Sequence, residues 1–232
     1  MIVVEDLVHK RGDTIALDGV SLRIDDGEFV ILAGANGSGK TTLVRHFNGL
    51  LEPDSGSISI NGHSVSEDPV TARTAVGMVF QNPRDCFVAA TVEADVAFGP
   101  ENLGLTREEI DRRVTDALEA VEMTSHRNRR IDQLSGGEQA RIAIAGALAM
   151  EPTHLVLDEP FTGLDWPSRQ AVLERLDALS AGGTSIVIVT HDLRELSERA
   201  DRIVVLSDGR IALSDTLDNA TPKLASLGVQ PC

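Results

Sequence analysis

Phe29-Val30-Ile31-Leu32-Ala33 runs directly into Gly34-Ala35-Asn36-Gly37-Ser38-Gly39-Lys40-Thr41-Thr42. The apolar run is typical of a buried strand, and the residues that follow Thr42 are typical of a helix. Between the two, the glycines let backbone N–H groups converge on phosphate oxygens. Lys40 brings a positive charge to the β- and γ-phosphates, and the Thr41 hydroxyl can reach Mg²⁺. The stretch therefore predicts a loop, from Gly34 to Thr42, that binds the phosphates of a nucleoside triphosphate.

The length and composition are typical of one large domain. The chain has 232 residues, of which 42% are hydrophobic, so a sizeable buried core is expected. No apolar run reaches the roughly 20 residues of a membrane-spanning helix, and no basic stretch at the start indicates a signal peptide. We therefore expect no direct membrane insertion. Cys86 and Cys232 lack metal-ligand spacing and are expected to be free thiols in a reducing compartment.

The charge is strongly acidic. With 36 acidic and 21 basic residues, the formal net charge is −15. Binding to nucleic acid requires a basic surface, so a nucleic-acid partner is not expected. The low aromatic content and the acidity fit a protein adapted to high salt, and they fit ordinary acidic solubility equally well. The sequence leaves both possibilities open.

Strand and helix signals alternate along the chain, which predicts an α/β core. Strands are expected at residues 2–4, 20–24, 29–33, 57–60, 77–80, 155–157 and 185–189, with a hairpin at 202–213 around Asp208-Gly209. Helices are expected after Thr106, from Gly137 to Met150 and from Pro167 to Gly182. The segment 216–232 carries no clear signal and is expected to be a short tail, either a small dimer contact or a frayed end.

Two further segments carry candidate chemistry. Leu155-Val156-Leu157-Asp158-Glu159-Pro160 is an apolar strand that ends in two acids. Asp158 is placed to hold Mg²⁺, as the second carboxylate site of P-loop NTPases does, and Glu159 can act as the base for the attacking water. Leu134-Ser135-Gly136-Gly137-Glu138-Gln139 opens the predicted buried helix, whose free N–H groups form a second anion site. A Ser-Gly-Gly sequence alone is usually only a turn.

In this order, the motifs resemble those of the ATP-binding cassette (ABC) ATPases. Gln81 is similar to the family's Q-loop, Gly163-Leu164-Asp165 to its D-loop, and Thr190-His191-Asp192 to its switch-histidine segment. The resemblance implies a single ABC domain, 1–232, with an α/β P-loop NTPase (RecA-like) core and an antiparallel β subdomain over about 1–82 and 151–215. An ABC α-helical subdomain over about 83–150 and the short tail 216–232 complete it.

The resemblance also implies a mechanism. Two cassettes pair head-to-tail, and each ATP is clamped between one P-loop and the partner's Ser135, Gly136, Gly137 and Glu138. Glu159, His191 and Gln81 are the implied catalytic residues, with His191 bound to the γ-phosphate. Thr41, Gln81 and Asp158 are the implied Mg²⁺ contacts, and Asp165 is placed at the dimer seam. Both a homodimer and a heterodimer fit the motifs.

One region indicates a branch of the family. Gln81-Asn82-Pro83-Arg84-Asp85 and the run from Thr91 to Leu105, with Val96-Ala97-Phe98-Gly99-Pro100, resemble the ATPase subunits of energy-coupling-factor (ECF) transporters. The resemblance implies an importer of cobalt, nickel or a vitamin such as biotin, at the cytoplasmic face of the membrane, with a membrane T component and a substrate-binding S component. Another ABC importer or exporter, a soluble non-transport ABC ATPase and a nucleotide sensor without turnover are the alternatives.

The sequence departs from the family where the nucleotide base binds. Family members usually stack an aromatic side chain on the base, but this chain has no Tyr, and the matching segment is Val8-His9-Lys10-Arg11-Gly12-Asp13. His9 and Arg11 are the candidates for stacking on the base, because a guanidinium can lie on a π-face. Selectivity for ATP over GTP therefore follows less firmly from the sequence than phosphate binding does.

Overall fold

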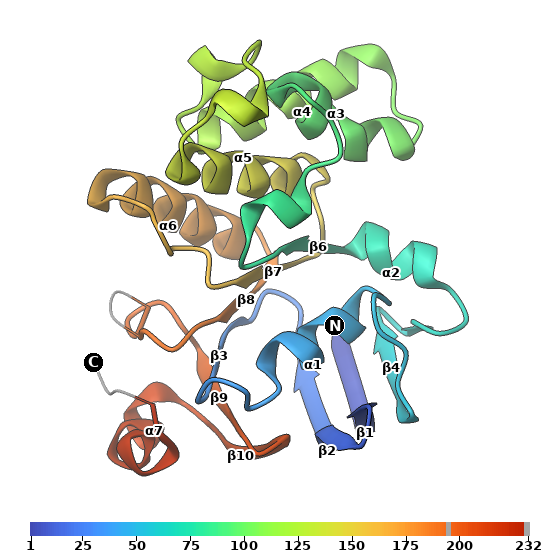
Figure 1. Cartoon of the computed structure of the whole chain (residues 1–232), viewed down its shortest axis with the longest axis vertical. Coiled ribbons are helices and arrows are strands. Elements are labelled where there is room, and N and C mark those ends of the chain that lie inside the picture. Colours follow the sequence, from blue (N-terminus) through green and yellow to red (C-terminus); the bar gives the residue numbers. More distant parts are fainter. Residues whose placement is uncertain (194–195, 230–232) are drawn as a thin grey trace.

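The computed structural model describes residues 1–193 and 196–229, and the predicted free thiol Cys232 lies outside these residues. Two sheets form the frame (Figure 1). A four-stranded antiparallel sheet has the order β2-β1-β4-β5, and a six-stranded sheet has the order β10-β9-β3-β8-β7-β6. Their strands are β1 (Ile2–Arg11), β2 (Thr14–Ile24), β3 (Phe29–Ala33), β4 (Ser55–Ile60), β5 (His63–Ser64), β6 (Val76–Val79), β7 (His154–Asp158), β8 (Ser185–Val189), β9 (Arg202–Ser207) and β10 (Arg210–Asp215).

The six-stranded sheet fixes where the candidate residues meet. Strands β9, β3, β8, β7 and β6 are parallel to one another, and only the edge strand β10 is antiparallel. The carboxyl ends of parallel strands lie at the same edge of a sheet, which is where open α/β sheets bind their ligands. Three segments therefore lie at the same edge of the sheet: the glycine-rich loop after β3, the acids at the end of β7 and the Thr190-His191 segment after β8.

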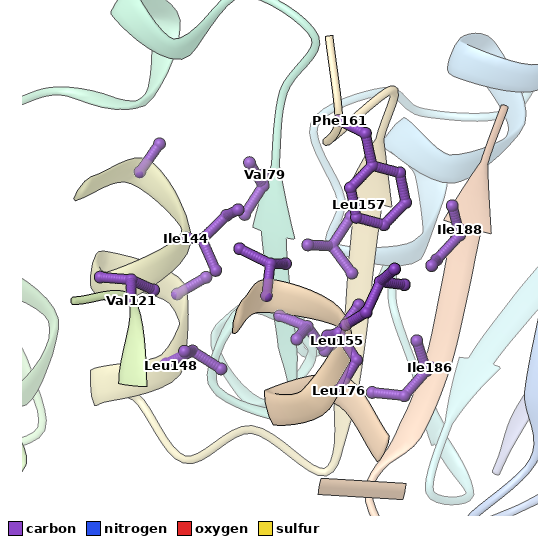
Figure 2. Close-up of a cluster of buried hydrophobic side chains, with 14 of the residues drawn as sticks. Val79, Val121, Ile144, Leu148, Leu155, Leu157, Phe161, Leu176, Ile186 and Ile188 are labelled. Carbon is purple, nitrogen blue, oxygen red and sulfur yellow. The ribbon is translucent and has the colours of Figure 1, made fainter. Parts of the chain in front are cut away.

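Side chains of the central strands alternate between two cores. Ile31, Leu155, Leu157, Ile186 and Ile188 belong to one buried cluster, because alternate residues of a strand point to the same face of its sheet. Figure 2 shows this cluster filling the space between the sheet and the neighbouring helices. Ile144 and Leu148 reach it from one helix, and Leu176 reaches it from another.

The other face of the same strands packs against the antiparallel sheet. Val30, Leu32 and Val187 lie in a second cluster together with Phe47 of helix α1 (Lys40–Phe47) and the inner side chains of β1, β2 and β4. Helix α1, which follows the glycine-rich loop, is therefore held between the two sheets. Strands β3, β7 and β8 are buried at every residue, as their apolar sequences predict for strands covered on both faces.

The remaining helices are α2 (Pro69–Ala75), α3 (Val92–Asn102), α4 (Arg107–Ala120), α5 (Gly136–Ala149), α6 (Trp166–Ala181) and α7 (Leu217–Leu224). Helices α3, α4 and α5 pack on one another away from the antiparallel sheet (Figure 1). The predicted α/β P-loop fold is confirmed, and so are the hairpin around Asp208-Gly209 and helices α4, α5 and α6. The division at residues 82/83 and 150/151 remains a proposal.

Several elements were missed or shortened in the predictions. Strand β1 continues to Arg11 and β2 begins at Thr14, but their pairing has irregularities between Val4 and Leu7 and again up to Lys10. Such bulges break the two-residue alternation by which a strand is recognised in a sequence. Helix α3 was missed because Gly99 and Pro100 are typical helix breakers, yet they lie near its end, after two complete turns.

The C-terminal segment is not frayed over its described part. Helix α7 buries Leu217, Ala220 and Leu224 against the larger cluster, and Val229 is buried beyond the helix. A Cβ placed on Gly228 would lie 3.8 Å from the Cβ of Ala35, so this segment passes beside the glycine-rich loop. Within the described ranges 1–193 and 196–229, no helix is both long and apolar enough to cross a membrane.

Candidate functional site

The glycine-rich loop has a shape that only glycine permits at two positions. Gly34 has φ 147°, and a Cβ there would lie 2.2 Å from the Leu206 carbonyl oxygen. Gly39 has φ 105°, and a Cβ there would lie 2.7 Å from the Ala16 carbonyl oxygen. Both backbone segments therefore come closer to neighbouring strands than any L side chain allows. The loop is consequently fixed from outside by β9 of the six-stranded sheet and by β2 of the antiparallel sheet.

The interior of this loop offers positive and neutral donors. Lys40 is 8% exposed, and its Nζ donates to the carbonyl oxygens of Gly34 at 2.8 Å and Ala35 at 2.9 Å. Burial lowers the pKa of Lys40, against an opposing effect of Glu159 and Asp158. The Ser38 hydroxyl is buried with no hydrogen-bond partner among the described residues. A buried ammonium and a free hydroxyl in a glycine cradle fit the oxygens of a polyphosphate.

Thr41 and Asp158 come together at the mouth of the loop. The Thr41 hydroxyl donates to Asp158 Oδ2 at 2.7 Å, although 117 positions separate the two residues. Asp158 is 4% exposed, and burial, reinforced by the neighbouring Glu159, raises its pKa. Hydroxyl and carboxylate oxygens are the ligand type that Mg²⁺ prefers in nucleotide sites. The pair therefore fits the predicted magnesium site.

Glu159 points away from Asp158 and toward the end of β8. Its Oε1 lies 2.6 Å from His191 Nδ1 and accepts from the His191 backbone N–H at 3.1 Å, while its Oε2 accepts from the Thr190 hydroxyl at 3.1 Å. The backbone of Glu159 has φ 50°, a strained conformation for a non-glycine residue. The strained turn aims the two neighbouring acids at different partners, which suits the separate roles predicted for them.

A cavity of about 560 Å³ joins these groups, and it is lined by Arg11, Thr14, Ile15, Ala16, Asn36, Gly37, Gly39, Lys40, Thr41, Thr42, Gln81, Asp158 and Glu159. Gln81 is exposed and reaches it from the loop after β6. His191 is not among the lining residues, but it contacts Glu159, which is. The predicted phosphate, metal and catalytic residues therefore line one cavity, with the exception of Gly34, Ala35, Ser38 and His191.

The predicted second anion site, Ser135 to Glu138, lies outside this cavity. Ser135 is the N-cap of α5, with a reciprocal capping box in which the Ser135 N–H donates to Glu138 Oε2 at 2.7 Å. Ser135 and Gly136 are exposed, and a Cβ on Gly137 would lie 3.2 Å from the Gly163 carbonyl oxygen. The Glu138 carboxylate also lies 3.1 Å from His126 Nε2. Within the chain, Glu138 therefore shapes the helix terminus, and none of the four residues lines the cavity.

Asp165 is exposed and caps another helix. Its side chain accepts from the Ser168 N–H at 3.0 Å at the start of α6, beside the exposed Trp166. Its position at a dimer seam remains a proposal.

Of the two residues predicted to contact the base, only one lines the cavity. Arg11 lines the cavity. His9 instead packs edge-on against His46, with ring centroids 4.8 Å apart, and its Nδ1 lies 3.3 Å from the Glu52 carbonyl oxygen. His9 therefore does not line the cavity.

Sequence reasoning missed some residues of the site. Thr14, Ile15 and Ala16, which line the cavity, were not singled out, and Thr190, which holds Glu159, was named only as part of the switch-histidine segment, without a role of its own. A signal existed for Thr190, because it directly follows a buried strand of the parallel sheet. Gln139, buried in α5, donates to the Ile131 and Leu134 carbonyl oxygens and so fixes the chain that leads to Ser135.

Comparisons with known proteins agree with this geometry. The family described as ABC transporter matches residues 17–162. A Halobacterium salinarum protein with the provisional name ABC transporter ATP-binding protein is 64% identical over the full length of both chains. The cobalt import ATP-binding protein CbiO of Syntrophus aciditrophicus is 46% identical over 93% of this chain and 78% of its own. The energy-coupling factor transporter ATP-binding protein EcfA of Methanocaldococcus jannaschii is 44% identical over 96% and 80%.

Solved structures resemble the chain over nearly its whole length. The cbiO1 protein of Clostridium perfringens, described as part of the ABC transporter complex cbiONQ, has a TM-score of 0.81 and 33% identity over 98% of this chain and 96% of that one. A dimeric ATP-binding cassette in a post-hydrolysis state, bound to ADP and Pi, has a TM-score of 0.84 and 29% identity over 93% and 98%. The chain therefore belongs to the ABC transporter family, as an ATP-binding and ATP-hydrolysing subunit.

Proposed function

We propose that this ATPase is the motor subunit of an ECF-type importer that carries a transition-metal ion such as cobalt or nickel, or a vitamin such as biotin. The observation that carries the catalytic part is the Glu159 carboxylate, which hydrogen-bonds Thr190 and His191 on one side and borders the cavity of Lys40 on the other. The relatives named CbiO and EcfA support the importer class.

In the proposed reaction, each residue has one task. The loop from Gly34 to Thr42 holds the phosphates, and Lys40 releases its two carbonyl partners to contact them. Mg²⁺ bound by Thr41, Asp158 and Gln81 would neutralise phosphate charge. Glu159 takes the proton of the attacking water, while Thr190 and the His191 N–H keep its carboxylate in place and His191 contacts the γ-phosphate.

We further propose that two cassettes act together. Ser135, Gly136, Gly137 and Glu138 lie outside the cavity of their own chain, and the exposed start of α5 is free to meet the phosphates bound by a partner cassette, with Asp165 at the seam. The γ-phosphate would contact both the glycine-rich loop of one cassette and the start of α5 of the other. Hydrolysis of ATP would remove this shared contact and release the partner. The dimeric cassette with ADP and Pi supports this arrangement.

A groove beside the Q-loop is the proposed place for the membrane T component. A hollow of about 400 Å³ is lined by Arg84, Phe87, Ala89, Ala90, Arg130, Ile131, Asp132 and Gln139. It adjoins the 3-10 turn Pro83–Cys86, directly after Gln81. Asp95 on α3 is 7% exposed and accepts from the N–H groups of Val88 and Ala89, so the floor of the groove is fixed to the helical layer. A helix in this groove would respond to movement of Gln81.

Co-purification from native membranes tests the proposal. An affinity-tagged chain should co-purify with a polytopic T protein and a second membrane protein, the S component, both identified by mass. The complex should place this chain at the cytoplasmic face of the membrane. The exposed Arg84 lines the groove, so Arg84→Glu should lose both partners, whereas Lys223→Glu, an equal change of charge on exposed α7, should keep them. A conventional permease pair would move the subunit to another importer or an exporter. Recovery without any membrane partner would contradict the transport function.

A further inference from the structure

Helix α1 connects the glycine-rich loop to the strand that leads into Gln81. The helix begins at Lys40, and its C-cap residue is Asn48. The Asn48 side chain is buried, and its Nδ2 donates to the sulfur of Met78 in β6 at 3.5 Å. Alternate residues along a strand point to the same face. Phe80, two positions after Met78, accordingly lies on the side that faces α1.

Arg45 makes a second contact between these two elements. It belongs to the last turn of α1, and its guanidinium carbon lies 5.9 Å from the centre of the Phe80 ring. A cation within about 6 Å of a ring centroid is attracted to the electron-rich face of the ring. Arg45 is exposed, and within residues 1–193 and 196–229 its guanidinium forms no hydrogen bond or ion pair. The contact with Phe80 is therefore what holds this side chain in place.

Phe80 is also the base of the loop that carries Gln81. The Phe80 backbone N–H donates to Cys86 Sγ at 3.4 Å, which closes the loop. Inside the loop, Asn82 Nδ2 donates to Asp85 Oδ1 at 3.0 Å. Gln81 lines the nucleotide cavity, but its side chain forms no hydrogen bond with any residue that the structure describes. The direction in which Gln81 projects is therefore set by the backbone that Phe80 anchors.

We propose that Arg45 is a positioning residue for Gln81. Its cation–π contact with Phe80 holds the base of the loop against α1, so that the Gln81 amide stays at the nucleotide cavity. Arg45 does not line the cavity, so it acts on Gln81 through Phe80 and not on the nucleotide. Because α1 also carries Lys40 at its start, one helix fixes Lys40 and Gln81 relative to each other. This inference rests on the role proposed above for Gln81 in hydrolysis.

Hydrogen exchange on the full chain measures the loop in the absence of nucleotide. Arg45→Ala should speed amide exchange over residues 81–86 by about two- to fivefold, because the lost contact frees the base of the loop. Arg45→Lys should keep the wild-type exchange, since an ammonium is also attracted to a ring face. Phe80→Leu removes the ring, keeps the charge of Arg45 and should give the same increase as Arg45→Ala. Arg107→Ala removes an exposed arginine at the start of α4 and should leave the exchange unchanged.

Steady-state hydrolysis measures the consequence for the reaction. Arg45→Ala should lower kcat by about two- to fivefold, the range that an exposed cation–π contact supports. The Kd for ATP, from titration calorimetry, should stay at the wild-type value, because Arg45 lies outside the cavity. Arg45→Lys should restore kcat. In a Gln81→Ala background, Arg45→Ala should cause no further loss, because the residue that it positions is absent.

The outcomes separate this inference from the role proposed for Gln81. If Arg45→Ala lowers kcat equally with and without the Gln81 side chain, Arg45 acts independently of Gln81 and the inference is wrong. Wild-type exchange and kcat in Phe80→Leu would show that only the charge of Arg45 matters, and would overturn the proposed contact. A slow Gln81→Ala variant beside a wild-type Arg45→Ala variant would overturn the positioning role alone. Hydrolysis by Gln81→Ala at the wild-type rate would contradict the role of Gln81 itself, and the positioning role with it.

Discussion

Glu159 combines a strained backbone with a fully occupied carboxylate. Its φ is 50°, and both of its oxygens have partners on the Thr190-His191 segment. Glu159→Gln keeps the size of the side chain and removes its ability to take a proton. We expect ATP hydrolysis to fall by about 10²-fold or more, the usual contribution of a general base. ATP binding should remain, and a closed dimer should accumulate with ATP, as measured by size-exclusion chromatography.

Glu119→Gln is a suitable control for that variant, since Glu119 is exposed on α4 and outside the cavity. Its hydrolysis rate should equal that of the wild type. Hydrolysis by Glu159→Gln at the wild-type rate would show that another group accepts the proton.

His154 predicts a pH dependence of stability. It is 0% exposed at the start of β7, and burial lowers its pKa to about 4, from 6.5 in the unfolded chain. Between these two pH values the unfolded chain binds a proton that the folded chain excludes. The free energy of unfolding therefore falls as the pH drops below 6.5, and this contribution levels off near pH 4. Between pH 7.5 and 5 the loss is about 2 kcal/mol.

Urea titrations at several pH values measure this effect. His154→Gln cannot take up a proton, so its free energy of unfolding should fall about 2 kcal/mol less than that of the wild type over the same interval. The exposed His63, replaced by Gln, should leave the wild-type slope intact. Equal slopes for wild type and His154→Gln would mean that the folded protein accommodates the charged imidazole.

Single residues were predictable from the sequence where a motif fixes their local geometry. Lys40 and Asp158 lie in runs whose strand, turn and helix signals are all local, so their convergence followed from parallel strand order. Ile15 could not be placed in this way, and Arg11 was named only through the family resemblance. Their position in the cavity depends on a hairpin whose register shifts between Val4 and Lys10, and no local signal records a bulge of that kind.

Helix α7 shows why an element with weak sequence signals still matters for stability. Leu217, Ala220 and Leu224 share one face and are buried in the larger core. Leu224 is 0% exposed. Leu224→Ala should lower the free energy of unfolding by about 2–5 kcal/mol, the usual cost of truncating a buried leucine. Chemical denaturation with two-state analysis measures the change.

Lys223 provides the control on the same helix. It is exposed next to Leu224, so Lys223→Ala should change stability by no more than about 0.5 kcal/mol. A Leu224→Ala variant as stable as the wild type would mean that α7 is not part of the cooperative core.

A helix or strand could be predicted where its sequence carried a strong periodic pattern of apolar residues or a clear cap. The periodic apolar face of α4 and its N-cap at Thr106 made that helix visible. Helix α7 contains Pro222 and only three buried side chains. Its local sequence therefore favours a helix only weakly, and the helix is stabilised by packing against the core. Tertiary packing, not local propensity, decides such short helices.

At the scale of the whole molecule, the excess of negative charge is the feature that most affects how stability depends on salt. Arg112 contacts Glu109, Asp116 and Glu151, but exposed ion pairs of this kind contribute about 0–1 kcal/mol each. The formal net charge of −15 remains after every basic residue has been counted. Exposed acids such as Glu119 and Asp218 form no ion pair with a described residue, so their repulsion is opposed only by the solvent.

Salt should therefore stabilise the fold. The Debye length falls from about 10 Å at 0.1 M to about 3 Å at 1 M, which removes repulsion between surface acids while the weak surface ion pairs have little to lose. We expect the midpoint of thermal unfolding to rise by about 5 °C or more between 0.1 and 1 M KCl. The double variant Glu119→Gln, Asp218→Asn should show a smaller rise, because two of the repelling charges are gone. An unfolding midpoint that stays constant across this range would leave ordinary acidic solubility as the reason for the charge and would contradict adaptation to high salt.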